Sequence, residues 1–363
     1  MTPATTTFET QLAAYKELLE PRIAALCQRL EQKAQQDFGD YSSQTIHAYT
    51  SILDRGGKRL RGSLVLSSYQ MCGGKDLEVV LPVAVAVEML QAYLLILDDI
   101  YDYSATRRGG PTAHVMMRDL HTQRGWRGDS LHFGEAVAGL SAFVGAHTAM
   151  EEVAKSALPA EARASILEII NRSMVVTGFG QVNDIFGEAA QDVGEEQVRR
   201  MLTWKTAHYS FISPLTVGAV AAGAPKDTLG CLHDYGIHAG LAFQVADDIL
   251  GTFGDESKSG KSTKDDLREG KITLLVARAL AQAQPAQRER LLEHLGNHEL
   301  TDAQYQECKT IIVESGALAY AYELAAQHSK LAMTALDGAD PQWQPKGIVF
   351  LTELAQYIVD RKG

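Results

Sequence analysis

Cysteine is scarce in this sequence, and the few that occur form no metal-binding or disulfide pattern. The four are Cys27, Cys72, Cys231 and Cys308, which lie far apart and include no CxxC pair. This spacing argues against a structural zinc site and indicates reduced thiols, as is usual in the cytoplasm. We therefore expect a cytoplasmic protein.

Positive charge is also in short supply. Lys and Arg number 34 against 45 Asp and Glu in 363 residues, which gives a formal net charge of -11. An acidic chain lacks the electrostatic footprint of a protein that binds nucleic acid or anionic lipid, so neither partner is expected. Any phosphate that it binds must be held by a local cluster of Lys and Arg.

We expect no targeting segment and no membrane span. Residues 1–15 are polar and lack the basic-then-apolar order of a signal peptide. The longest stretch without Asp, Glu, Lys or Arg, Thr206–Pro225, contains His208, Pro214 and many small residues. These features favour a buried core helix over a membrane span.

Strand signals are nearly absent, whereas helical periodicity covers most of the chain. The pattern predicts helices over residues 9–38, 43–53, 62–71, 77–101, 133–157, 160–186, 195–222, 226–250, 272–283, 286–295, 302–314, 318–335 and 346–361. Two polar segments, 107–128 and 251–270, are expected to be loops beside a site. Since there is no long linker and no repeat, we predict one all-α domain over 1–363, a large helical bundle.

The apolar stretch Leu81–Asp102, most of it in the helix predicted over 77–101, ends in three aspartates. Asp98 and Asp102 are four residues apart and therefore share one helix face, with Asp99 beside them. Like charges destabilise a helix C-terminus, which prefers cations. A divalent cation with oxygen ligands would compensate for this repulsion. Taken alone the pattern is weak, because it also arises by chance in a chain this acidic.

A second acidic pair, Asp247 and Asp248, ends another apolar segment, and Gln244 shares its helix face. Two such helix ends are difficult to explain as ordinary solvated charge. Facing each other across a bundle, they would hold several Mg²⁺ ions that keep waters and diphosphate oxygens as further ligands.

Basic residues accompany both acidic motifs. They are Lys58 and Arg61 in a glycine-rich turn, Arg107 and Arg108 after the first motif, Lys205 on the helix of small residues, and Lys261 and Lys271 after the second motif. Each alone is best interpreted as a surface charge. Together with two metal clusters they indicate a site for two diphosphates.

These motifs, in this order, resemble the trans-prenyltransferase (polyprenyl synthetase) family over roughly residues 52–275, with a weaker similarity at 357–362. The matching pieces are Gly56–Arg61, Asp98–Asp102, Arg107–Gly109, Gly180–Gln181 with Asp184, Lys205–Thr206, Phe243–Gln244 with Asp247–Asp248, and Gly260–Lys261 through Gly270–Lys271. The resemblance implies an isoprenoid synthase fold, a homodimer, and Mg²⁺-dependent condensation of isopentenyl diphosphate with an allylic diphosphate.

The resemblance also implies a role for each matching residue. Asp98, Asp99, Asp102, Asp247 and Asp248 would bind or support Mg²⁺, three ions in all; Arg107, Lys205 and Lys261 would neutralise the allylic diphosphate; Lys58, Arg61, Gln91 and Arg108 would hold isopentenyl diphosphate; Thr206, Gln181 and Gln244 would line the reacting carbons; and Lys271 would belong to a closing loop. The catalytic set is then Asp98, Asp102, Arg107, Lys205, Thr206, Gln244, Asp247 and Lys261.

Two other activities are weighed against this interpretation. A terpene cyclase of the same fold needs only one diphosphate, so the turn at Gly56–Arg61 and Arg108 would have no purpose. A non-catalytic partner subunit would usually have lost aspartates from one motif, whereas both motifs are present here. The observation that best supports a non-catalytic subunit is Gly251, which stands where the resembling family often has an aspartate. The next acidic residue is Asp255.

The residues one turn before the first acidic motif predict the length of the product. Tyr93 and Leu94 precede Asp98 by five and four residues, about 6–8 Å down the helix. In the resembling family, aromatic side chains at both positions tend to stop growth at fifteen carbons, and an aromatic only at the deeper one tends to allow twenty. We therefore predict geranylgeranyl diphosphate, with farnesyl diphosphate as the alternative.

Overall fold

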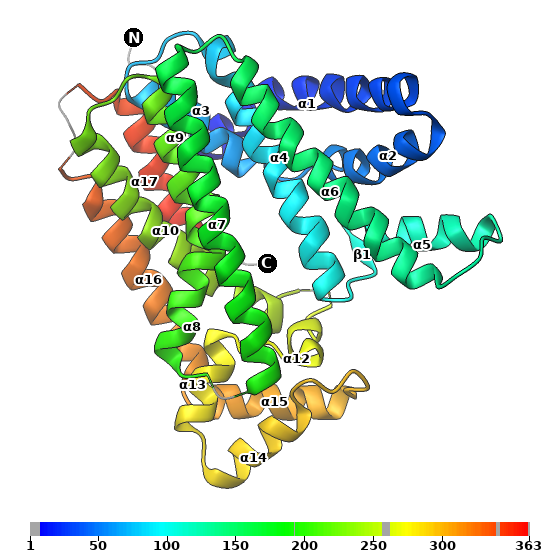
Figure 1. The fold of residues 1–363 in the computed structure, drawn as a ribbon. Coiled ribbons are helices and arrows are strands. Elements are labelled where there is room, and N and C mark those ends of the chain that lie inside the picture. The colour runs from blue at the N-terminus through cyan, green and yellow to red at the C-terminus, as the bar shows by residue number, and fades with distance from the viewer. Residues whose placement is uncertain (1–7, 192, 256–261, 339–341, 362–363) are drawn as a thin grey trace. The chain divides into compact units, whose positions relative to one another are not determined.

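Helices make up nearly all of the chain in a computed structural model, which describes residues 8–191, 193–255, 262–338 and 342–361 (Figure 1). The only strands among these residues are β1 (Thr106–Arg107) and β2 (Gly110–Pro111), which pair as a short antiparallel hairpin. The prediction of an all-α fold is confirmed. Contacts divide the described chain into two compact units, and the prediction of a single domain over 1–363 stays a prediction.

The first unit runs to Leu167 and includes Val217–Gly223. Its elements are α1 (Phe8–Phe38), α2 (Asp40–Asp54), α3 (Leu60–Met71), α4 (Leu77–Tyr101), the hairpin, α5 (Ala113–Gln123), α6 (Ser130–Lys155), the start of α7 (Ala160–Ala190) and the end of α9 (Ser213–Ala221). Figure 1 shows α1 and α2 side by side, and their contacts agree.

Helix α4 forms the centre of the first unit and carries the first acidic motif at its end. It packs against α3 and α6, and most of its residues from Val80 to Ala92 are fully buried. Its N-terminus is capped by Asp76, whose side chain accepts the backbone N–H of Glu78 at 3.0 Å. By length and composition α4 is apolar enough to cross a membrane, but 72% of the most apolar window is buried inside the fold. It is therefore a core helix.

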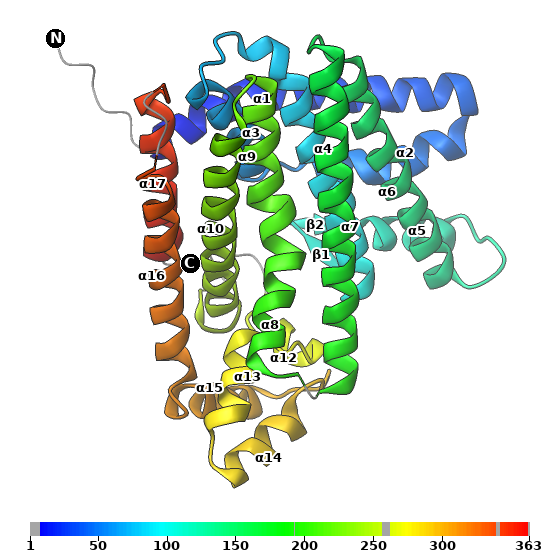
Figure 2. The ribbon, with the colours of Figure 1, turned by 60° about the vertical axis from the view of Figure 1, so that its left-hand side comes forward.

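The second unit comprises Glu168–Thr216 and the described residues from Ala224 onward. Besides most of α7 it contains α8 (Glu195–Leu202), the π-helix η1 (Thr203–Ile212), α10 (Lys226–Phe253), α12 (Asp265–Glu269), α13 (Leu274–Gln282), α14 (Pro285–His294), α15 (Asp302–Glu314), α16 (Ala317–Ala335) and α17 (Pro345–Asp360). Helix α10 lies beside α16 in Figure 2, and it also packs against η1 and α17.

The structure differs from the predicted helices in three places. The helix expected over 195–222 changes pitch in η1, where Ser213 N donates to His208 O, five residues back. The segments 107–128 and 251–270, expected to be loops, contain α5 and α12. Helix α5 forms because its apolar face packs against α6, a tertiary contact that local polarity does not reveal.

Candidate active site

The three aspartates at the end of α4 differ in how deeply they are buried. Asp99 is fully buried, whereas the side chain of Asp98 is 27% exposed. Asp102 caps the helix, with its backbone N–H donating to Asp98 O at 2.8 Å, and it is half-buried. Asp98 and Asp102 therefore keep oxygens that solvent-borne ligands can reach, and Asp99 points into the protein.

Arg107 is the partner of the buried aspartate. The hairpin turns the chain back so that Arg107 Nε donates to Asp99 Oδ1 at 2.8 Å, while its Nη2 lies 3.6 Å from Asp98 Oδ2. Burial by itself lowers the pKa of Arg107, but its hydrogen bond to Asp99 and the charges of Asp99, Asp98 and Asp102 raise it overall. One guanidinium thus offsets part of three carboxylate charges, and the helix end stays acidic.

A cluster of cations occupies the same unit, around the turn that leads into α3. Arg59 is almost fully buried and forms ion pairs with Glu20 at 3.1 Å and Glu88 at 3.8 Å, so it fixes the turn. Lys58 is exposed and Arg61 is half-buried on either side of it. The backbone of Arg59 has a φ of 50°, a left-handed value that a non-glycine residue adopts only when its surroundings hold it there.

Arg108 completes this cationic cluster, which we define as Lys58, Arg59, Arg61 and Arg108. Its guanidinium lies against Gly57, where an added Cβ would come 3.1 Å from Nη2. Desolvation lowers the pKa of Arg108 to about 10, and the charges of Arg59, Arg107 and Arg61 add to this effect. Crowded guanidinium groups repel one another, and a bound anion relieves that repulsion.

The remaining residues assigned in the first unit lie on α4 before Asp98. Gln91 is 7% exposed, and its Oε1 has no hydrogen-bond partner among the described residues. Tyr93 and Leu94 are both half-buried. Burial also raises the pKa of Tyr93, with a smaller effect from Tyr101.

In the second unit, η1 places Lys205 and Thr206 beside α7. Gly180 on α7 makes this possible, because an added Cβ would come 2.4 Å from Lys205 N. Lys205 Nζ then pairs with Asp184, which is 7% exposed and one turn after Gly180. Gln181 follows Gly180 and is half-buried.

A hydrogen-bonded chain connects η1 to the acidic pair of α10. Thr206 Oγ1 donates to Gln244 Oε1 at 2.8 Å, and Gln244 Nε2 donates to Asp248 Oδ1 at 2.8 Å. The helices approach closely here because α10 has Gly240, where an added Cβ would lie 2.4 Å from Ala207 Cβ. The sequence grouped Thr206 and Gln244 by resemblance, and the structure brings them into contact.

The two aspartates of α10 differ in the same way as those of α4. Asp248 is 6% exposed, and its Oδ2 has no hydrogen-bond partner among the described residues. Burial raises its pKa to about 8, and the charges of Asp266 and Asp247 raise it further against the hydrogen bond from Gln244. The Asp247 side chain is 40% exposed and lies 2.7 Å from Arg361 Nη2.

Several residues that contact the candidate site residues were not predicted from the sequence. A Cβ at Gly251 would come 2.7 Å from Asp266 Oδ2, so Asp266, and not Asp255, fills the space beside this glycine. Arg59 and its partner Glu88 were also missed; the one available signal was Glu88 as a lone acid in an apolar helix. Lys271 forms an ion pair with Glu269 at 2.8 Å, and Lys261 lies outside the described residues.

Comparison with solved structures identifies the class of protein. Geranylgeranyl pyrophosphate synthase from Corynebacterium glutamicum, solved with isoprenyl diphosphate and magnesium, matches with a TM-score of 0.91 and 30% identity, over 96% of this chain and 99% of that one. The chain therefore has the fold of the isoprenoid synthases.

Sequence comparison gives the family. The polyprenyl synthetase family model matches residues 43–312. Geranylgeranyl diphosphate synthase of Saccharolobus solfataricus is 33% identical over 92% of this chain and 94% of its own length. A short chain isoprenyl diphosphate synthase of Methanothermobacter thermautotrophicus is 33% identical over 97% and 98%. The chain belongs to the polyprenyl synthetase family and is a trans-prenyltransferase, as the sequence motifs predicted.

Proposed function

We propose that this protein condenses isopentenyl diphosphate with an allylic diphosphate to give geranylgeranyl diphosphate. The observation that carries the proposal is the pairing, within the first unit, of an acidic helix end with the crowded cationic cluster. A carboxylate-rich end suits metal ions, and crowded guanidinium groups suit a diphosphate. Relatives named geranylgeranyl diphosphate synthase support twenty carbons over fifteen.

The donor sets fit Mg²⁺. Asp98, Asp102 and Asp247 have accessible carboxylates, and Asp99 and Asp248 support them from buried positions. Among the described residues no three His, Cys, Asp or Glu side chains form a ready-made cage. Mg²⁺ sites of this kind take their remaining ligands from water and phosphate. Bound Mg²⁺, three ions in our proposal, would neutralise the diphosphate leaving group.

The protein's own residues then have separate tasks. Lys58, Arg61 and Arg108 hold isopentenyl diphosphate, with Gln91 beside them. Arg107 and Lys205, together with Lys261, stabilise the negative charge that develops on the allylic diphosphate as its C–O bond breaks. Thr206, Gln181 and Gln244 line the reacting carbons, and Lys271 belongs to a closing segment. Apolar surroundings keep water from the allylic cation.

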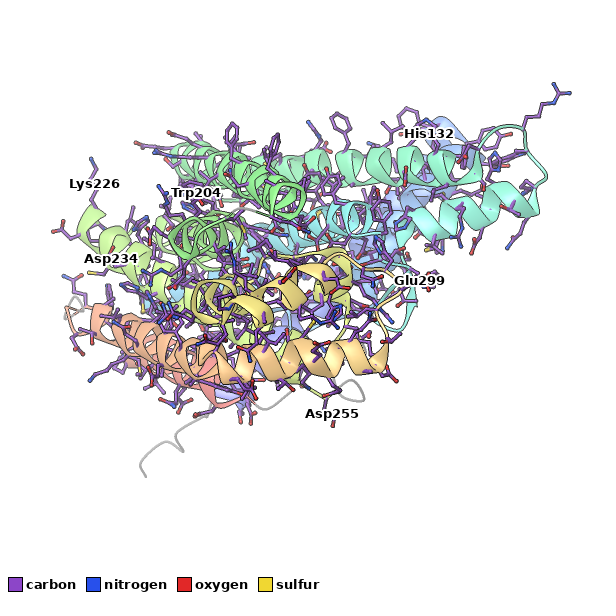
Figure 3. All side chains as sticks on the ribbon, turned by 90° about the horizontal axis from the view of Figure 1, so that it is seen from below. His132, Trp204, Lys226, Asp234, Asp255 and Glu299 are labelled. Atoms are coloured by element: carbon purple, nitrogen blue, oxygen red, sulfur yellow. The ribbon has the colours of Figure 1, made fainter. Side chains whose placement is uncertain are left out.

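We also propose a cytoplasmic homodimer. On α6, Leu140, Phe143 and Val144 are 60%, 55% and 41% exposed. On α7, exposed apolar side chains recur at helical spacing, namely Val175, Val182, Phe179 and Phe186. Figure 3 shows side chains projecting outward from α6 near the labelled His132. Apolar faces of this extent are typical of an interface between copies of one chain. Light scattering should give a dimer, and Phe179→Lys with Phe186→Lys should give a monomer.

Product analysis tests the activity. Purified protein, Mg²⁺, isopentenyl diphosphate and the ten-carbon allylic primer geranyl diphosphate should yield a twenty-carbon diphosphate, and chelator should abolish it. Asp98→Ala and Asp247→Ala should each lower turnover by about 100-fold or more. Asp234→Ala is the matched control, because Asp234 is an exposed carboxylate on α10 outside the proposed site. Absence of turnover in the wild type would favour the partner-subunit alternative, and a fifteen-carbon end product would favour farnesyl diphosphate.

A further inference from the structure

The last described residue, Arg361, lies directly against an aspartate of α10. Helix α17 ends at Asp360, and the backbone N–H of Arg361 donates to Tyr357 O at 3.1 Å. Its Nη2 is 2.7 Å from Asp247 Oδ1 and donates to Phe243 O at 2.8 Å. The side chains of Arg361 and Asp247 are 11% and 40% exposed, so the cation is the more deeply held partner.

Several contacts fix the guanidinium in this position. It lies over the ring of Phe243, 4.4 Å from the centroid, and Nε donates to Ile358 O at 3.2 Å. Phe243 in turn contacts the fully buried Phe211 edge-on, with ring centroids 5.4 Å apart. An arginine that stacks on a ring, donates two hydrogen bonds and forms an ion pair is held in one position, whereas a surface cation contacts a carboxylate only transiently.

We propose that Arg361 is a counter-ion of Asp247 in the metal-free protein, and that it competes with Mg²⁺ for this carboxylate. The inference rests on the proposed function, in which Asp247 is a metal ligand. Arginine stays protonated in proteins, so its charge cannot be removed when a divalent cation arrives. Two cations at one carboxylate repel each other, and metal binding therefore displaces Arg361 and loosens the last turn of α17. The end of α17 acts as an internal competitor of the metal.

The decisive measurement is metal affinity without substrate. Mn²⁺ alone, followed by the paramagnetic resonance signal of the free ion, is the probe. Arg361→Ala should bind Mn²⁺ about threefold to tenfold more tightly than the wild type, as expected for loss of a partly exposed ion pair. Arg361→Lys keeps the charge but loses the stacked and doubly hydrogen-bonded position, so its Mn²⁺ affinity should lie between those of the wild type and Arg361→Ala.

Arg278→Ala is the matched control. Arg278 also combines an ion pair, 3.1 Å to Glu195 Oε2, with a stacked ring, 4.2 Å to the centroid of Tyr320. It lies in the same unit and belongs to no proposed site, so its removal should leave Mn²⁺ affinity unchanged. Thermal melting of each variant verifies that the fold is retained.

Hydrogen exchange gives the second measurement. In the wild type, Mg²⁺ with inorganic pyrophosphate should speed amide exchange over residues 358–361, whereas Arg361→Ala should exchange rapidly with or without these ligands. Equal or weaker Mn²⁺ binding by Arg361→Ala would overturn the proposal and leave Arg361 as a structural contact. Asp247→Asn distinguishes failure of this inference from failure of the proposed function. If this variant binds Mn²⁺ as the wild type does, Asp247 is not a metal ligand.

Discussion

Gly240 should be intolerant of even the smallest side chain. An added Cβ would lie 2.4 Å from Ala207 Cβ and 2.6 Å from Ala207 Cα, about 1 Å inside ordinary carbon–carbon contact. Relieving such an overlap costs about 1–3 kcal/mol, and alanine returns about 0.5–1 kcal/mol of helix propensity. We therefore expect Gly240→Ala to lower the free energy of unfolding by about 1–2 kcal/mol.

The matched control is Gly230→Ala on the same helix. Gly230 is exposed and an added Cβ meets nothing within 4 Å, so this change should stabilise the protein by about 0.5–1 kcal/mol. Urea unfolding measures both variants. Because Gly240 sets the distance between Thr206 and Gln244, a shift of about 1 Å should also reduce turnover by about 100-fold. Equal stability of the two variants would refute the close approach of α10 to η1.

Three further predictions concern titration, kinetics and product length. Because the pKa of Asp248 is raised to about 8, the stability that this group contributes is complete at low pH and is lost as the pH rises through 8. In chelator, the wild type should lose about 2 kcal/mol of unfolding free energy between pH 6 and 8, and Asp248→Asn should not. The same pH dependence of urea unfolding in both proteins would contradict this. Steady-state kinetics should show Lys58→Ala raising the KM for isopentenyl diphosphate and Lys205→Ala lowering kcat; identical effects would remove the distinction. Chromatography should show a longer product for Tyr93→Ala and a shorter one for Leu94→Phe. An unchanged product in both variants would show that these two residues do not set the chain length.

Much of the fold was predictable because helical periodicity is a local signal. The helices predicted over 77–101 and 302–314 match α4 and α15 residue for residue. Helix α5 could not be predicted in this way, because its apolar face has meaning only against α6. The structure also shows η1 approaching α7 and α10 closely at Gly180 and Gly240, contacts that no window of the sequence reveals.

Which residues form the candidate site was predicted from the sequence and stays a prediction, whereas their contacts come from the structure. Charge repulsion at the end of α4 pointed to Asp98 and Asp102, and the structure adds that Arg107 neutralises Asp99. The acid beside Gly251 was unpredictable from spacing, since Asp266 comes from a separate short helix. Arg361 illustrates the same limit, because a residue far along the chain contacts Asp247 only through the packing of α17 on α10.

The pitch of the π-helix η1 sets the direction in which Lys205 points. Its wider turns hold more residues than an α-helix of the same rise, between two segments of ordinary pitch. If Thr203–Ile212 relaxed to α-helical pitch with all its residues kept, Lys205 would rotate by about 100° relative to Phe211. Such a change of pitch alone would turn the cation away from Asp184 while leaving every functional side chain present in the sequence.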